Sequence, residues 1–330
     1  MPRPSAYLFY PCSRSAEDQL NALFDFVWPT AIAMWNLRWQ LKGFIAEHPD
    51  ATHLEISQRF ISSQRINPPH KLNWANLSES QAGAWEDQTR QLARIVLINA
   101  FAVYEAFLED LCKEVGLSGY ENEHLQFPVS APKVDRSGSH SYQDVLSSLA
   151  LTPSPIITSE LYPGLVGGRN NNLANLEPMM VCYRCFKEMR NAVIHGGGKV
   201  SSVYRRDAIN TFVHACSPLQ LGISHMTPPQ VVAIGDMVQL ELPFVVAFTA
   251  VLRKLIATLD AEFAKHLRAE DSLVEQWRAI FEPNVLLKLD IGRRHRQLRN
   301  RLHTMGLPEP QISTALDTLL QQKGAYQCVF

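Results

Sequence analysis

A long stretch without glycine or proline, from Gln88 to Val115, constrains the fold more than any other feature of this chain. Large apolar residues recur in it at alternating spacings of four and three, which is the period of one face of an α-helix. They are Leu97, Phe101, Tyr104, Leu108, Leu111 and Val115. Because such a face must be buried against other elements, the pattern predicts a central helix of a helical bundle.

Helical patterns are also predicted on both sides of this stretch. The first helix is expected to begin at Ser15, where Ser15 and Asp18 resemble a capping box, and to kink at Pro29 before it ends near Glu47. A second helix is expected over about residues 51–64. An apolar helix is expected from Phe244 to about His266.

Two segments have a different character. Residues 118–175 are rich in Gly, Pro, Ser and Asn, so they predict a long loop-rich insertion, interrupted by a short helix at about Tyr142 to Leu149. An insertion of this length exceeds what a structural connection needs, and it could cover a functional site. Residues 229–242 predict two short strands around Gly235-Asp236, forming a small β-ribbon.

The segment Arg190-Asn191-Ala192-Val193-Ile194-His195, followed by three glycines, combines a permanent cation, an amide and a titratable imidazole. Arginine can hold a phosphate through paired hydrogen bonds, and histidine can transfer protons near neutral pH. On an ideal helix Arg190 and His195 lie about 140° apart, whereas Asn191 and His195 share a face. A compact site therefore needs either a loosened last turn or a second copy of the chain. The alternative is a solvated arginine and a histidine that interacts with the helix dipole.

This segment resembles the Arg-x4-His motif of HEPN-domain ribonucleases, in which Asn commonly follows the Arg. The sequence YEAFLEDL from Tyr104 to Leu111 is similar to the helix that precedes the motif in the RiboL-PSP/MAE-like branch of that family. The resemblance covers roughly residues 80–266 and includes the predicted order of long helix, Arg-His helix, small β-ribbon and closing helix. The fold class that it implies is all-α: a HEPN-like antiparallel helical bundle with a small β-ribbon insertion and additional N- and C-terminal helices.

The resemblance implies a metal-independent endoribonuclease that acts as a homodimer, with the motifs of two chains facing one another. The ribose 2′-hydroxyl would attack the phosphate, leaving a 2′,3′-cyclic phosphate and a 5′-hydroxyl. Arg190 would stabilise the phosphate, His195 would transfer protons, and Asn191 would orient the reacting group. Glu105 is a weaker candidate that could tether Arg190, or it could be an ordinary surface charge. The resemblance further implies a toxin or anti-phage role with an antitoxin or defence-system partner, and no cofactor or metal.

The tail from residue 269 to 330 predicts two or three short helices and contains the densest positive segment. Its candidate RNA-binding residues are Arg293, Arg294, Arg296, Arg299 and Arg301. A solvated face balanced by nearby acidic residues is the equally weighted alternative. Three domains are predicted: an N-terminal helical segment (1–75), the HEPN-like domain (76–268) and a basic C-terminal segment (269–330).

Composition limits the remaining possibilities. With 46% apolar and 19% charged residues the chain is globular, and its net charge of −1 requires any RNA site to be a local patch. The start lacks the pattern of a secretory leader, and the apolar run from Leu242 to Leu252 is too short for a bilayer, so no membrane association and a cytoplasmic location are expected. Cys182 and Cys185 form a lone pair, which favours buried free thiols over a zinc or redox site.

Two other functions stay open on the sequence alone. One is a catalytically silent HEPN module that binds a nucleotide or a partner protein. The other is a helical nucleic-acid-binding regulator that acts through the basic tail.

Overall fold

The computed structural model describes residues 7–60, 84–117, 119–130, 140–223, 226, 229–281, 285–311 and 314–329. Its long helices are α1 (Pro11–Glu47), α4 (Ala84–Val115), α9 (Leu176–His195), α10 (Val203–Ala215) and α12 (Leu242–Ala264). Shorter helices are α2 (His53–Phe60), α5 (Gly119–His124), α6 (Tyr142–Leu149), α7 (Pro155–Glu160), α8 (Tyr162–Val166) and α11 (Pro218–Leu221), with a 3₁₀ turn at Leu173–Asn175. The tail adds α13 (Ala269–Ile280), α14 (Ile291–Thr304) and α15 (Thr314–Gln322).

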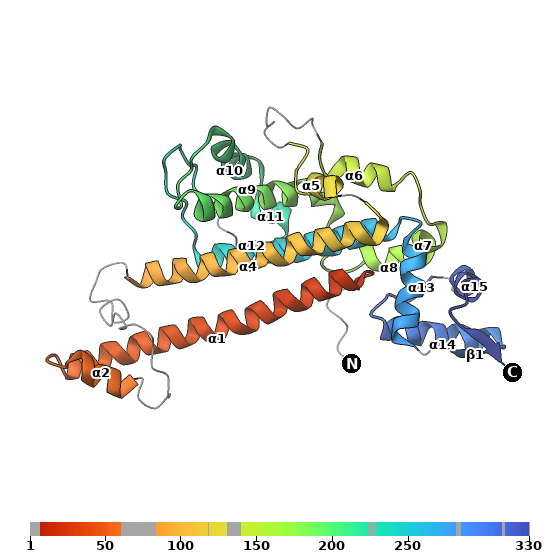
Figure 1. Cartoon of the computed structure of the whole chain (residues 1–330), viewed down its shortest axis with the longest axis horizontal. Helices are drawn as coiled ribbons and strands as arrows, with labels where there is room; N and C mark the ends of the chain where they lie inside the picture. The colour runs from red at the N-terminus through yellow and green to blue at the C-terminus, as the bar shows by residue number, and fades with distance from the viewer. Residues whose placement is uncertain are drawn as a thin grey trace.

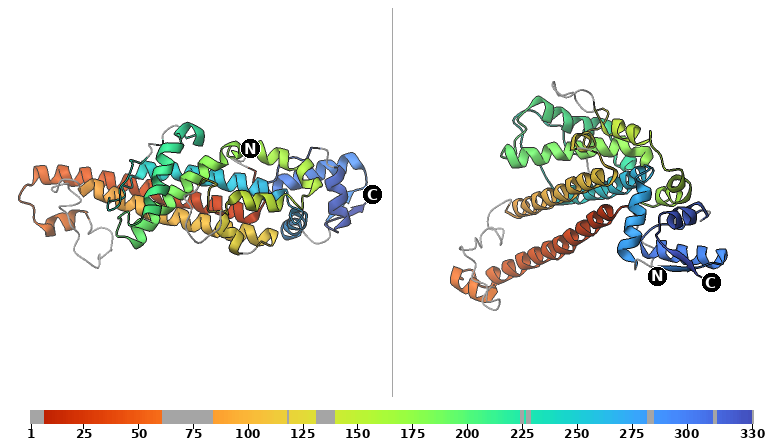
Figure 2. Two further views of the ribbon diagram at one scale, coloured as in Figure 1. Left: turned by 90° about the horizontal axis from the view of Figure 1, so that it is seen from above. Right: turned by 45° about the vertical axis from the view of Figure 1, so that its right-hand side comes forward.

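The long helices run side by side along the longest axis of the molecule (Figures 1 and 2). α4 and α12 each pack against both α1 and α9, and α10 covers α9 from the outside. Phe101 of α4 meets Tyr183 of α9, while Arg94, earlier in α4, lies beside Gly198, just after α9. α4 and α9 are therefore antiparallel, and the all-α class is confirmed.

One continuous apolar core joins these helices. All six residues of the predicted stripe on α4 are buried, so the central helix is confirmed. A set of ring contacts connects three helices: Phe101 lies 5.3 Å from Tyr183 and from Phe248, and Phe186 lies 4.1 Å from Phe248, measured between ring centroids. Trp277 of the tail is buried in the same core.

The first helix begins earlier than predicted. α1 starts at Pro11 with Tyr10 as its N-cap, and the Ser15 hydroxyl instead accepts a hydrogen bond from Gln19. A residue far along the chain stabilises this start: the Asp260 carboxylate of α12 accepts hydrogen bonds from the backbone N–H groups of Phe9 (2.6 Å) and Tyr10 (2.9 Å). The helix continues through Pro29 without a break. Of the predicted second helix, residues 53–60 are helical and residues 61–64 lie outside the described part, as does the 75/76 domain boundary.

The predicted loop-rich insertion is mostly helical where the structure describes it. α6 has the predicted bounds and begins with a capping box between Ser141 and Asp144. α7 was not predicted; it begins at Ser154, whose hydroxyl accepts a hydrogen bond from the Ile157 N–H, with proline in the first turn. Serine and proline residues that suggested loops are therefore helix starts here.

The β-structure lies elsewhere than predicted. Among the described residues of 229–242 there is a turn and a single antiparallel bridge, between Lys199 and Met237, and no strand. This segment pairs with residues 198–200 instead of with itself: Val238 N–H bonds to the Gly198 carbonyl (2.8 Å) and Val200 N–H to the Asp236 carbonyl (2.9 Å). The two strands of the structure, β1 (Leu286–Lys288) and β2 (Gln327–Val329), form a parallel pair in the tail.

α12 is long and apolar enough to cross a membrane by length and composition, although the run to Leu252 alone is too short. Two thirds of its most apolar window is buried in the helical bundle, and a core helix passes the same test. The cytoplasmic location remains a prediction.

Candidate functional site

The predicted Arg-His segment forms the last turns of α9. The helix extends to His195 and ends at Gly196, and the Ala192 carbonyl accepts hydrogen bonds from the N–H groups of Gly196 and Gly198, both at 2.9 Å. Gly197 and Gly198 have φ values of +60° and +88°, which glycine adopts with little strain. The turn that loosens therefore follows His195 instead of lying between Arg190 and His195.

Arg190 is held in place and remains partly accessible. Its guanidinium lies 3.7 Å from the Glu105 carboxylate of α4 and donates a hydrogen bond to the Asn191 side-chain oxygen at 3.2 Å. Its guanidinium carbon is 5.9 Å from the centre of the Phe101 ring, and 22% of the side chain is exposed. Glu105 and Arg190 therefore form an ion pair between α4 and α9, and the role of Glu105 in positioning Arg190 stays a prediction.

Lys187 is a second cation at the same carboxylate, and sequence reasoning missed it. Its ammonium lies 3.1 Å from Glu105 and also contacts Gln126. Burial lowers the pKa of Lys187, and the neighbouring Glu105 carboxylate opposes part of that change. Because one carboxylate faces Lys187 and Arg190 together, this part of the surface keeps an excess of positive charge. The sequence held a signal for this second cation: Lys187 lies three residues before Arg190, so the two side chains are neighbours on the same helix.

The His195 side chain is exposed and forms no hydrogen bond or ion pair with any residue that the structure describes. Asn191, predicted to share a face with His195, accepts its hydrogen bond from Arg190 instead. Since the helix is regular through His195, Arg190 and His195 point in directions about 140° apart. A single chain thus supplies the two groups on different sides of α9.

Arg94 of α4 is a further cation beside the turn after His195. A Cβ atom placed on Gly198 would lie 3.9 Å from an Arg94 guanidinium nitrogen and 2.9 Å from the Met237 methyl group. Gly198 therefore allows a close approach of α4 and the 229–241 segment to the end of α9. Arg94 has no ion pair with any described residue. Its position depends on the antiparallel packing of α4 and α9, which no local sequence signal gives.

A buried ionic network fixes the preceding turns of α9. Glu188 pairs with Arg184 of its own helix and with Arg205 of α10, the latter at 3.2 Å. The Arg184 guanidinium lies over the rings of Phe127 and Tyr204 at 4.4 and 5.2 Å. The Glu188 carboxylate thus pairs with two guanidinium groups and links α9 to α10.

The insertion contacts the earlier part of α9. Glu177 accepts hydrogen bonds from the backbone N–H groups of Val129 and Ser130, and the other described contacts with α9 reach as far as Lys187. The insertion therefore covers the start and middle of α9, and the described part does not cover His195.

The two neighbouring cysteines of α9 are buried thiols that resist ionisation. Cys182 and Cys185 are free and buried, and burial raises the pKa of both thiols well above the usual value. The prediction of buried free thiols is confirmed. Within the described ranges no group of His, Cys, Asp and Glu could hold a metal ion.

The tail arginines do not form a uniform basic track. Arg294 binds the buried Asp317 through its Nε (2.9 and 3.1 Å), and Arg301 lies 4.7 Å from the Phe281 ring. Arg299 pairs with Glu309 at 2.7 Å, whereas Arg293 and Arg296 are exposed. Two of the five predicted RNA contacts are therefore engaged in packing the tail.

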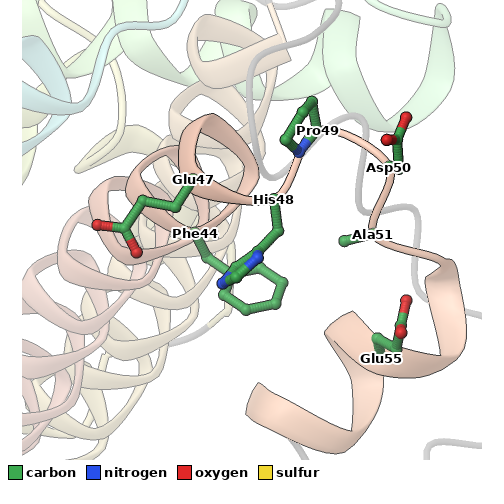
Figure 3. Close-up of a pocket in the computed structure, with 7 residues that line it drawn as sticks. All are labelled: Phe44, Glu47, His48, Pro49, Asp50, Ala51 and Glu55. Atoms are coloured by element: carbon green, nitrogen blue, oxygen red, sulfur yellow. The ribbon is translucent and has the colours of Figure 1, made fainter.

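A hollow of about 510 Å³ lies where α1 passes into α2 (Figure 3). The carboxylates of Glu47, Asp50 and Glu55 point in different directions around it. Glu55 accepts a hydrogen bond from the Thr52 backbone N–H at 2.7 Å, so it caps α2. These groups do not converge on a common point, and we assign no function to this hollow.

Comparisons of the chain with models of known protein families, with curated proteins and with solved structures find no match.

Proposed function

We propose that this protein is a metal-independent endoribonuclease of the HEPN type. The observation that carries the proposal is the end of α9, where a partly exposed Arg190 paired with Glu105 and an exposed His195 lie in the last turns of one helix among further cations. Lys187 and Arg94 add positive charge for an RNA backbone in a chain whose net charge is −1. The family resemblance of the segment to Arg-x4-His nucleases supplies the reaction type.

The reaction needs few groups because the substrate brings its own nucleophile. The 2′-hydroxyl attacks the adjacent phosphorus while His195 accepts its proton, and Arg190 stabilises the charge that accumulates on the phosphoryl oxygens. The bond to the 5′-oxygen then breaks, and that oxygen takes a proton from an imidazolium. The products are a 2′,3′-cyclic phosphate and a 5′-hydroxyl.

The separation of Arg190 and His195 favours a shared site in a homodimer. If two chains meet around a two-fold axis at the ends of α9, Arg190 of one chain can face His195 of the other. Exposed apolar side chains near this end suit such an interface: Ile194 precedes His195, and Ile95 and Ile98 follow Arg94 on α4. By analogy with the resemblance, we place the enzyme among toxins or anti-phage effectors with a cognate partner.

The test is cleavage of RNA by the purified protein in EDTA. We expect products with cyclic phosphate ends, no cleavage of DNA, and a loss of about 10²–10³-fold in rate for Arg190→Ala and for His195→Ala. Arg206→Ala and His214→Ala on α10 are matched controls that should cleave as the parent does, because both side chains lie at least partly exposed on a different helix.

Two results would overturn the proposal. One is cleavage that requires a divalent ion or that acts equally on DNA. The other is parental activity in the Arg190 and His195 variants. No cleavage of any RNA by a folded dimer would favour the catalytically silent binding module.

A further inference from the structure

A second hollow lies in the tail, outside the segment that carries the Arg-His motif. Its volume is about 300 Å³. It is lined by Tyr7 from the start of the chain, Arg296, Arg299, Asn300 and His303 of α14, and Glu309. The four residues of α14 follow one another at spacings of three, one and three, so they share one face of the helix.

The packing of α14 decides which face is presented. Leu298 and Leu302 are buried on the other side, and Arg294 is fixed to the buried Asp317. The first turn of α14 is capped by Asp290, whose carboxylate accepts a hydrogen bond from the Arg293 N–H. The arrangement of the polar face is therefore set by the core of the tail.

The start of the chain, which contributes Tyr7 to the hollow, is also anchored. Arg14 donates hydrogen bonds to the carbonyls of Leu8 (2.7 Å) and Phe9 (3.0 Å) and to the Gln276 side chain (2.6 Å). The Asp260 carboxylate of α12 accepts the backbone N–H groups of Phe9 and Tyr10. The chain just after Tyr7 is therefore fixed to α12 and α13. Tyr7 itself is partly buried against the core.

Positive charge is in excess around this hollow. Two guanidinium groups and a single carboxylate, that of Glu309, line the hollow together with the His303 imidazole, and Glu309 pairs with Arg299 at 2.7 Å. Arg296 is exposed and has no ion pair with any described residue. Such a group of donors matches a dianionic phosphate, because guanidinium offers paired N–H groups to phosphate oxygens.

We propose that this hollow binds a free nucleoside monophosphate. Arg296 and Arg299 would take the phosphate, and the ring of Tyr7 offers an aromatic surface for the base. The Asn300 amide, which can donate and accept, suits the ribose or the polar edge of the base. The volume is at the lower end of small-molecule pockets and suits one nucleotide.

The experiment is calorimetric titration of the full-length protein with each of the four ribonucleoside 5′-monophosphates, with inorganic phosphate and with the unphosphorylated nucleosides. We expect one saturable site per chain for at least one nucleotide, and much weaker binding of phosphate or nucleoside alone. Arg296→Ala should weaken nucleotide binding at least about 10-fold, as the loss of a charge-assisted contact does. Arg293→Ala, an exposed arginine of the same helix that does not line the hollow, should leave it unchanged.

The same titration on His195→Ala separates this proposal from the ribonuclease, because nucleotide binding should persist there whether or not RNA is cleaved. The proposal is overturned if no nucleotide binds at millimolar concentration or if Arg296→Ala binds as the parent does. It is also overturned if phosphate competes as well as the nucleotide, or if only RNA oligonucleotides bind. Circular dichroism of each variant confirms that it is folded.

Discussion

Asp260 offers a sharp test of how the chain start is attached to the bundle. The carboxylate is fully buried in α12 and accepts the backbone N–H groups of Phe9 and Tyr10. Burial raises the pKa of Asp260 from 3.8 to about 6, although the hydrogen bonds from Phe9 and Tyr10 act in the opposite direction. We therefore predict that Asp260→Asn, whose side chain has a similar size and cannot ionise, changes how the free energy of unfolding depends on pH.

The sign follows from comparing the two states. Because the pKa is higher in the folded protein, the unfolded chain releases the proton first as the pH rises. The contribution that protonated Asp260 makes to the stability of the folded protein is complete below pH 3.8 and is lost as the pH rises through about 6. The full loss corresponds to about 3 kcal/mol, of which about 2 kcal/mol falls between about pH 4.5 and 7.5.

The assay is urea unfolding followed by tryptophan fluorescence and circular dichroism across that pH range. The free energy of unfolding of the parent should fall by about 2 kcal/mol relative to Asp260→Asn as the pH rises. Asp18→Asn, which removes an exposed carboxylate of α1, is the matched control, and its profile should run parallel to that of the parent. Parallel profiles for the parent and Asp260→Asn would refute the reasoning.

Three further predictions follow from single contacts. Glu105→Gln should lower RNA cleavage about 10-fold or more in a protein that circular dichroism shows to be folded, because Arg190 loses the carboxylate that positions it; unchanged single-turnover rates would contradict this. Arg294→Ala should lower the free energy of unfolding by about 1–3 kcal/mol because it takes a charge-assisted partner from the buried Asp317, and a change under about 0.5 kcal/mol would show that the contact is not needed. Gly198→Ala should cost about 1–2 kcal/mol in urea unfolding because φ is +88°, and an equally stable variant would contradict the strain argument.

The sequence predicted four of the five long helices, α1, α4, α9 and α12, and it did not predict α10. The apolar stripe of α4, the short helix α6 and the apolar run of α12 were predicted from local patterns, and the structure confirms them because helix formation depends on near neighbours. The sequence also placed Arg190 and His195 at the end of a helix with a glycine terminus, since both the periodicity and the glycines are local.

Only the tertiary structure decided how distant segments act on one another. The Asp260 carboxylate binds the backbone at the start of α1, although it lies 250 residues further along the chain than Tyr10. The 229–242 segment was predicted to pair with itself, and its backbone forms hydrogen bonds with residues 198–200 instead. Glu105 and Arg94 of α4 lie beside Lys187, Arg190 and the turn after α9 only because α4 and α9 pack antiparallel. Hydrogen bonds and charges depend on distance in space, and a sequence records that distance only for residues close together along the chain.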